Sequence, residues 1–323
     1  MKAIVYTKYG SPDVLELKEV AKPTPKDDQV LVKVRATSVN LSDWEFLTGR
    51  PLYARVTGLR RPGSQILGSD IAGQVAAVGK NVTKFQPGDA VFGDILQYMG
   101  GFAEYVCAPE HRLAQKPDGL TFAQAAAIPQ AGVIALQGIR DKGQIQAGQK
   151  VLINGAGGGA GSFAVQLAKM VGAAVTAVDN TAKLEFMRTL GADHVIDYTQ
   201  EDFTKNGAQY DFILDVIAYR SAFAYKRSLS SQGRYYMVGG SMSTLFSVLI
   251  WGALLGMRGH KKIAILPVQP NTKDLLALTE LVAAGKIAPM IDRCYALEDT
   301  AVALRYLGEG QSKGKVVITV ADD

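Results

Sequence analysis

The stretch "KVLINGAGGGAGSFAVQLAKM", residues 150–170, places five glycines between a run of apolar residues and a helical pattern. "KVLI" is typical of a buried strand, and the residues after Gly161 repeat apolar side chains at helical spacing. Glycines at such a turn let backbone N–H groups approach a pyrophosphate and let the helix pack close to the strand. The stretch therefore predicts a dinucleotide-binding turn. The expected cofactor contacts in it are Gly155, Gly157, Gly158, Gly159, Ala160 and Gly161.

An acidic residue supports this interpretation. Asp179 ends the next predicted strand, "AAVTAVD". A carboxylate about 20 residues after the glycines can accept hydrogen bonds from a ribose hydroxyl. Asn180 follows it directly, and Gly239 lies in a Gly/Ser turn after the later strand "YYMV". We add these three residues to the expected cofactor contacts.

The rest of the chain predicts two domains. From "DGLTFAQ" onward, strands alternate with helix-length patterns, which is typical of right-handed crossovers and a parallel sheet. The first 120 residues or so instead contain short β-branched runs separated by Pro/Gly turns such as "KPTPKDD". We expect an α/β protein: a doubly wound Rossmann domain over 122–262, and a partly open β-barrel catalytic domain over 1–121 and 263–323.

Composition and charge exclude several classes of protein. The 323 residues are 48% hydrophobic, and their net charge of +5 is scattered rather than massed, so we expect small-molecule ligands and no nucleic acid. Cys107 and Cys294 belong to no C-x-x-C motif, which fits a reducing cytoplasm.

The opening residues have no apolar signal-peptide core. The uncharged segment 245–257 is too short to span a bilayer, so a buried or subunit-interface helix is expected rather than a membrane-surface contact.

Several motifs in order along the chain resemble a known family: "FQPGDAVFGDI", "GGFAEYV", "INGAGGGAGSFAVQLAKMVGA", "LGADHVIDY" and "GKVVITV". Together they resemble the medium-chain dehydrogenase/reductase superfamily, and within it the zinc-independent quinone oxidoreductase branch. The resemblance covers essentially the whole chain. It implies a GroES-like catalytic domain beside the Rossmann domain, and NAD(P)H-dependent reduction of quinones or α,β-unsaturated carbonyl compounds.

The same resemblance allows the metal question to be tested. Zinc members of the superfamily have a Cys after the third strand, a G-H-E motif, and a further Cys or Asp at the domain junction. The corresponding places here are Asn40, Ser69-Asp70 and Gln130. Imidazole and thiolate ligands are missing from all of them, and His111, His194 and His260 share no ligand spacing. We therefore expect no metal site.

Without a Lewis acid, oxidation of a simple alcohol is difficult, whereas an electron-poor quinone or enone mainly needs to be oriented toward the cofactor. Asn40 and Asp43 resemble the family's Asn-x-x-Asp and are expected to form a polar floor beside the nicotinamide. The alternative is a structural role, with Ser42 or Asp43 as a helix N-cap. Tyr53 is the nearest candidate proton donor, but its spacing departs from that of relatives with a catalytic Tyr, which favours a role in the pocket wall.

The cofactor choice rests on conflicting signals. Asp179 would repel the 2′-phosphate of NADPH, which favours NADH. Lys183 and Tyr198 match positions that contact this phosphate in similar quinone oxidoreductases, although Lys183 could also be a solvated helix charge. We expect NADH to be slightly preferred.

Two further expectations concern assembly and activity. The apolar segment 245–257 predicts a homodimer. A second functional hypothesis is a catalytically silent, zeta-crystallin-like protein that binds the dinucleotide as a sensor or structural component.

Overall fold

The computed structural model describes residues 1–56, 58–257 and 260–320 and separates into two compact units. The mixed-sheet unit contains Met1–Gln130, Pro270–Gly285 and, as far as it is described, 289–320. The parallel-sheet unit contains Ala131–Gln269 and Lys286–Ala288. Each unit is described by itself below.

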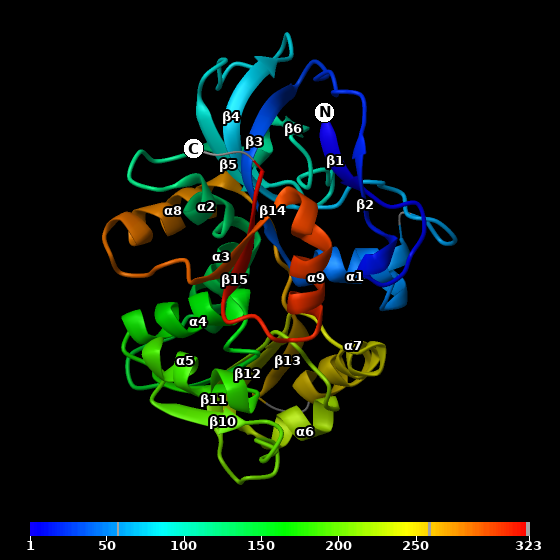
Figure 1. Cartoon of the computed structure of the whole chain (residues 1–323). Coiled ribbons are helices and arrows are strands. Elements are labelled where there is room, and N and C mark those ends of the chain that lie inside the picture. Colours follow the sequence, from blue (N-terminus) through cyan, green and yellow to red (C-terminus); the bar gives the residue numbers. More distant parts are fainter. Residues whose placement is uncertain (57, 258–259, 321–323) are drawn as a thin grey trace. The chain divides into compact units, whose positions relative to one another are not determined.

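The parallel-sheet unit has the expected alternation of strands and helices (Figure 1). Its strands are β8 (Lys150–Asn154), β9 (Ala174–Asp179), β10 (His194–Asp197), β11 (Tyr210–Asp215), β12 (Leu229–Met237) and β13 (Lys262–Ile265). Its helices are α4 (Gly159–Met170), α5 (Leu184–Thr189), α6 (Ala222–Arg227) and α7 (Met242–Met257). The strands pair in parallel in the order β10-β9-β8-β11-β12-β13. The direction of progression therefore reverses between β8 and β11, which makes this the topological switch point of a doubly wound sheet.

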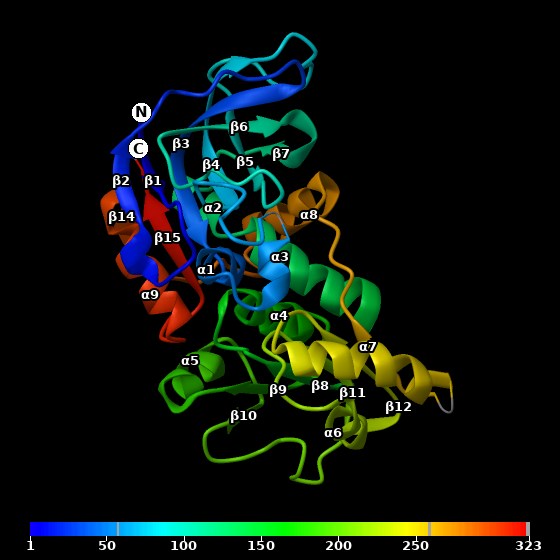
Figure 2. The same ribbon diagram turned by 90° about the vertical axis from the view of Figure 1, so that its right-hand side faces the viewer.

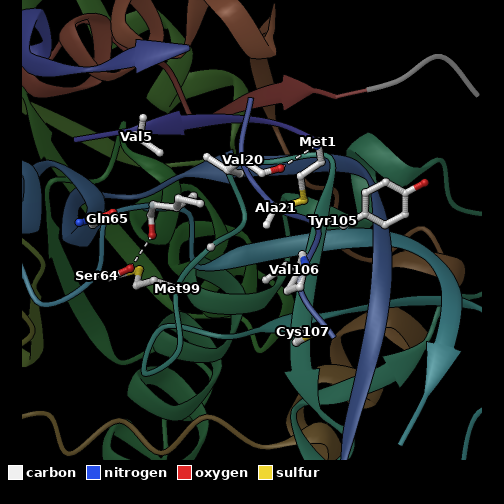
Figure 3. A pocket seen from close by; sticks show the side chains of 13 residues that line it. Met1, Val5, Val20, Ala21, Ser64, Gln65, Met99, Tyr105, Val106 and Cys107 are labelled. Atoms are coloured by element: carbon white, nitrogen blue, oxygen red, sulfur yellow. Dashed lines mark hydrogen bonds between the residues drawn. The ribbon is translucent and has the colours of Figure 1, made fainter. Parts of the chain in front are cut away.

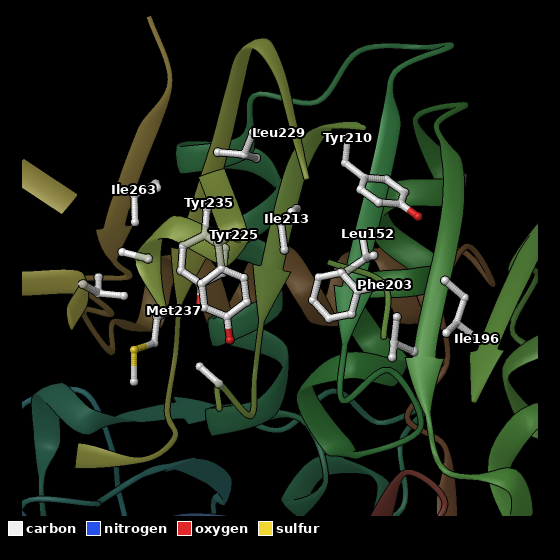
Figure 4. Packing of buried hydrophobic residues seen from close by; sticks show 14 residues of the cluster. Leu152, Ile196, Phe203, Tyr210, Ile213, Tyr225, Leu229, Tyr235, Met237 and Ile263 are labelled. Carbon is white, nitrogen blue, oxygen red and sulfur yellow. The ribbon is translucent and has the colours of Figure 1, made fainter. Parts of the chain in front are cut away.

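Helices cover both faces of this sheet, with α4 and α5 on one face and α6 and α7 on the other (Figures 1 and 2). On the second face, Leu152 and Ile213 from the central strands pack with Tyr225 of α6 (Figure 4). Val248 of α7 belongs to the same buried cluster. Because side chains alternate along a strand, the apolar runs of β8 and β11 supply both layers of the core.

The mixed-sheet unit is built mainly from antiparallel strands. They are β3 (Gln29–Val39), β4 (Asp70–Val78), β5 (Ala90–Asp94), β6 (Tyr105–Pro109), β7 (Leu113–Gln115), β14 (Ile291–Ala296) and β15 (Lys315–Thr319). They pair in the order β14-β15-β3-β4-β5-β7, with β6 also paired to β3, while β1 (Lys2–Val5) and β2 (Glu16–Glu19) pair with each other. Its helices are α1 (Leu41–Thr48), α2 (Phe122–Ala126), α8 (Thr272–Ala283) and α9 (Thr300–Gly308).

The unit boundaries differ from the predicted ones at residues 121/122 and 262/263. The predicted second boundary lies inside β13, which pairs with β12 and so keeps residues 263–269 in the parallel-sheet unit. At the first boundary, α2 packs against β3 and β4, so the division falls later, within α3 (Pro129–Leu136). In both places tertiary pairing, which leaves no local sequence signal, decides where the unit ends.

Candidate functional site

The glycine loop joins the carboxyl end of β8 to the first turn of α4. Gly155 has a φ of +77°, which favours glycine, and a Cβ on Gly161 would lie 2.1 Å from the Gly155 carbonyl oxygen. The start of α4 can therefore approach the end of β8 only when residue 161 has no side chain. The first N–H groups of α4 lack intrahelical acceptors and, together with the helix dipole, favour an anion such as a pyrophosphate. The chain's geometry thus fits a dinucleotide.

Asp179 holds this loop from the end of β9. Its Oδ2 accepts a hydrogen bond of 3.0 Å from the backbone N–H of Gly157, and its Oδ1 accepts one of 2.8 Å from Asn180. Lys183 Nζ lies 3.4 Å from Asp179 Oδ1, and both side chains are buried. The alternative interpretation of Lys183 as a solvated charge is therefore wrong. The side chain of Lys183 lies over Gly157, where an added Cβ would come within 2.6 Å of its Cδ.

The other expected cofactor contacts lie at the same, carboxyl edge of the parallel sheet. The N–H of Tyr198, which follows β10, donates to the Asp179 carbonyl at 3.1 Å, and its side chain is 53% exposed. The Asn180 side chain accepts from Ala182 N–H and so caps the short helix η5 (Thr181–Lys183). Gly239 follows β12, and its carbonyl accepts from Ala218 N–H at 2.8 Å. Ligands bind at this edge in doubly wound sheets.

A buried polar cluster occupies the mixed-sheet unit, centred on Lys315 at the start of β15. Lys315 Nζ donates to Asn40 Oδ1 at 2.5 Å and lies 3.5 Å from Asp70 Oδ2. Asn40 Nδ2 donates to Asp70 Oδ2 at 2.9 Å and to Ser69 Oγ at 3.1 Å. Both amide hydrogens and the amide oxygen of Asn40 are thus engaged inside the protein.

Asp43 is equally committed to internal contacts. Its Oδ2 accepts from the N–H of Asn40 at 2.8 Å and its Oδ1 from the N–H of Gly68 at 3.0 Å. Asn40, rather than Ser42 or Asp43, is the N-cap residue of α1. The proposed N-cap roles of Ser42 and Asp43 are therefore wrong; Asp43 takes part in the cap from the first turn of α1, by accepting from the N–H of Asn40. Both side chains are buried, so the expected polar floor is not open to solvent within this unit.

Burial shapes the protonation of the cluster. Burial raises the pKa of Asp43 to about 7, with hydrogen bonds from Asn40 and Gly68 opposing the shift. Burial and the charge of Asp70 likewise raise the pKa of Asp94 to about 7. Burial lowers the pKa of Lys315, while the surrounding carboxylates raise it. The Lys315 ammonium lies 3.5 Å from Asp70 Oδ2 and so supplies a compensating positive charge inside the cluster.

The positions expected to replace zinc ligands do come together. Asp70 Oδ1 accepts from the backbone N–H of Gln130 at 3.1 Å, so Asn40, Ser69, Asp70 and Gln130 are joined by hydrogen bonds. Within the described ranges, no group of three or more His, Cys, Asp and Glu side chains is arranged to hold a metal ion. The three histidines are exposed and both cysteines are free.

The sequence analysis does not identify Lys315 as a candidate site residue. The one sequence feature that indicates its burial is its position directly before the apolar run "VVITV". If that strand is buried, its first residue can be buried as well.

Tyr53 lies on the short helix η2 (Leu52–Arg55). Its hydroxyl donates to Glu45 Oε1 at 2.7 Å, and the side chain is 40% exposed. Burial raises the pKa of Glu45, and the hydrogen bond from Tyr53 opposes that shift. The structure therefore offers a solvent-accessible hydroxyl beside a carboxyl group.

A cavity of about 370 Å³ lies elsewhere in the mixed-sheet unit, between the β1/β2 strands and β6 (Figure 3). Its lining is mostly apolar and includes Val5, Val20, Met99 and Cys107, but none of the predicted catalytic residues. The cavity is thus separate from the Lys315 cluster.

Comparisons with known proteins agree with this geometry. Residues 26–118 match the family model described as "Alcohol dehydrogenase GroES-like domain", and residues 190–318 match the one described as "Zinc-binding dehydrogenase". A 2-methylene-furan-3-one reductase of Solanum lycopersicum is 35% identical over 98% of this chain and 79% of its own. An NADPH-dependent alkenal/one oxidoreductase, chloroplastic, of Arabidopsis thaliana is 33% identical over the same shares. The solved quinone oxidoreductase from Coxiella burnetii superposes with a TM-score of 0.87 at 30% identity, over 99% of each chain.

Proposed function

Because the chain belongs to the zinc-independent quinone oxidoreductase branch of the medium-chain dehydrogenase/reductase superfamily, we propose that it reduces quinones or α,β-unsaturated carbonyl compounds with NAD(P)H. The observation that carries the proposal is the glycine loop at the switch point of the parallel sheet, braced by Asp179. The names of the relatives support the substrate class, since they describe reductases of enones, alkenals and quinones.

A bound reduced nicotinamide would supply the hydride for an electron-poor carbon conjugated with a carbonyl group. The chain would contribute binding and orientation: the first turn of α4 would bind the pyrophosphate, and Asp179 holds the glycine loop in place by accepting from the N–H of Gly157. A proton must then reach the enolate or hydroquinone anion. Tyr53 is the proposed donor: its hydroxyl would give up its hydrogen bond to Glu45, pass its proton to the anion and regain a proton from solvent.

We assign Asn40 and Asp43 positioning roles in this reaction rather than direct contact with the substrate. Their polar atoms are hydrogen-bonded to Lys315, Ser69, Asp70 and the backbone. The same cluster supports the proposal that no zinc takes part. A divalent ion bound at these positions would face the fixed ammonium of Lys315, 3.5 Å from Asp70.

We propose NADH as the preferred cofactor, by a few-fold only. The Asp179 carboxylate is fixed at the end of β9, where it can accept from a ribose hydroxyl and would oppose a 2′-phosphate. Lys183 limits the preference, because its buried ammonium neutralises part of that charge.

The exposed face of α7 supports a homodimer. Phe246, Leu249, Ile250 and Leu254 recur at helical spacing, and each is about half exposed. Beside α7, β13 is the last strand of its sheet and pairs only with β12 among the described strands. An apolar helix next to an open sheet edge suits an isologous contact with a second copy.

Among the described residues, no helix is both long and apolar enough to cross a bilayer. We propose the cytoplasm as the compartment, on the basis of the two free cysteines.

The decisive experiment measures oxidation of NADH and NADPH by the purified protein with a panel of quinones, enals and enones. Substrate-dependent oxidation supports the proposal. Simple alcohol oxidation only after zinc addition would contradict it.

The second candidate function is binding of the dinucleotide without catalysis. It is favoured by the hydrogen bonds that Asn40 and Asp43 make inside the protein. Its signature would be a dinucleotide-dependent rise in Tm without turnover of any compound in the panel.

A further inference from the structure

A second buried polar group lies in the parallel-sheet unit, at the carboxyl end of β11. Asp215 is fully buried. Its Oδ1 accepts a hydrogen bond of 2.7 Å from Asn154 Nδ2, and its Oδ2 accepts one of 2.9 Å from the Tyr235 hydroxyl. Tyr225 stacks on Tyr235, with ring centroids 4.0 Å apart. Burial raises the pKa of Asp215, and hydrogen bonds from Asn154, Tyr225 and Tyr235 oppose that shift.

The position of this group matters more than its burial. Asn154 is the last residue of β8 and directly precedes Gly155 of the glycine loop. Asp215 is the last residue of β11 and is its register partner. The Asn154–Asp215 hydrogen bond therefore bridges the two strands between which the sheet reverses direction, at the edge where dinucleotides bind.

The same contact ties together the segments that follow three strands. Asn154 Nδ2 also donates to the Ile217 carbonyl at 3.0 Å, so Asp215 fixes an amide that joins the glycine loop to the segment after β11. The Val216 N–H donates to the Asn154 carbonyl at 3.0 Å. The Val238 N–H, just after β12, donates to the Asp215 carbonyl at 2.8 Å.

If the Asn154 side-chain amide lost its hydrogen bond to Asp215, the glycine loop that follows Asn154 would shift. A Cβ on Gly155 would lie 3.3 Å from Val216 Cβ, so the loop already packs closely on the segment after β11. Small displacements there change how the loop N–H groups meet a pyrophosphate, because such contacts depend steeply on geometry.

We propose that Asp215 is a positioning residue of the dinucleotide site, which sets the Asn154 side chain and through it the glycine loop. The inference rests on the dinucleotide site of the proposed function, but it does not require that the bound cofactor be turned over.

The chain offers a matched control on the same strand. Asp211 accepts from Lys150 N–H at 2.9 Å and from the Ser230 hydroxyl at 2.7 Å, so it also links β11 to its two neighbours. It lies toward the amino end of β11, away from the glycine loop. Asp211→Asn should therefore lower stability without weakening cofactor binding.

The experiment is a fluorescence titration of wild type, Asp215→Asn and Asp211→Asn with NADH and with NADPH, accompanied by Tm and steady-state kinetics. We expect Asp215→Asn to raise the Kd of both cofactors about tenfold and to raise KM more than it lowers kcat, whereas Asp211→Asn stays within about twofold of wild type.

If Asp215→Asn does not fold, Tyr235→Phe keeps the stacked ring and removes one donor, and its Kd should rise about threefold. A folded Asp215→Asn, or in its absence Tyr235→Phe, with unchanged Kd overturns the inference, and so does equal weakening by Asp211→Asn. Wild type that binds without turnover refutes the proposed reaction alone, and wild type that binds neither cofactor refutes both.

Discussion

Lys315→Met is the sharpest test of the buried cluster. The substitution removes the ammonium that donates to Asn40 Oδ1 at 2.5 Å and lies 3.5 Å from Asp70 Oδ2. It leaves a carboxylate without its cation and an amide oxygen without its donor, both buried. Breaking a buried ion pair from one side destabilises by about 3–5 kcal/mol. At the lower figure, Tm should fall by about 6–12 °C at pH 8 for a unit of this size.

The loss should depend on pH in a defined direction. Burial already raises the pKa of Asp70 above its ordinary 3.8, while Lys315 lowers it. Without the lysine this pKa rises further, so the folded variant holds a proton that the unfolded chain releases. The contribution of Asp70 to the stability of the variant is then greatest below pH 4 or so and is lost as pH rises through the folded pKa. Relative to wild type, Lys315→Met should be less damaging at pH 5 than at pH 8.

Thermal and urea unfolding at both pH values measure this difference. Lys313→Met is the control, because Lys313 lies two residues earlier and is exposed. A Tm within 2 °C or so of wild type at pH 8, or an equal loss at both pH values, would show that Lys315 does not compensate Asp70.

Three further outcomes are expected. Gly161→Ala, whose Cβ would lie 2.1 Å from a carbonyl oxygen, should lower Tm and abolish NADH binding in a fluorescence titration. Gly119→Ala, which meets nothing within 4 Å, should do neither. Asp179→Ser should shift the ratio of kcat/KM values toward NADPH by about tenfold, and an unchanged ratio would exclude Asp179 as the discriminating residue. Ile250→Glu should convert a dimer to a monomer in sedimentation velocity, whereas Leu276→Glu on α8 should not; a monomeric wild type would contradict the proposed interface.

The features that the sequence predicted well are local. The alternation of apolar strands with helical patterns indicates a parallel sheet, and the structure and its relatives confirm the doubly wound fold with a GroES-like domain. Gly155 and Gly161 could be assigned because a positive φ and a close helix–strand approach each require glycine within one short turn.

The features that were missed depend on partners far away in sequence. Lys315 is separated from Asn40 by 275 residues, so no local pattern indicates that its charge is buried. The burial of Lys183, which the sequence already offered as a cofactor contact, depends on the fold as well, because its side chain occupies the space above Gly157, 26 residues earlier. β13 likewise joins the parallel sheet only through its pairing with β12.

The distance along the chain between Asp70 and its cation has a consequence for biosynthesis. The ion pair joins residues 245 positions apart, and the whole parallel-sheet unit is made between them. At about 5–20 residues per second, a ribosome needs roughly 12–50 s to extend the chain from Asp70 to Lys315. During that time β3 and β4 have neither β15 nor its lysine. The parallel-sheet unit, nearly continuous in sequence, can fold meanwhile, so the nascent mixed sheet carries an uncompensated acidic centre until β15 is made.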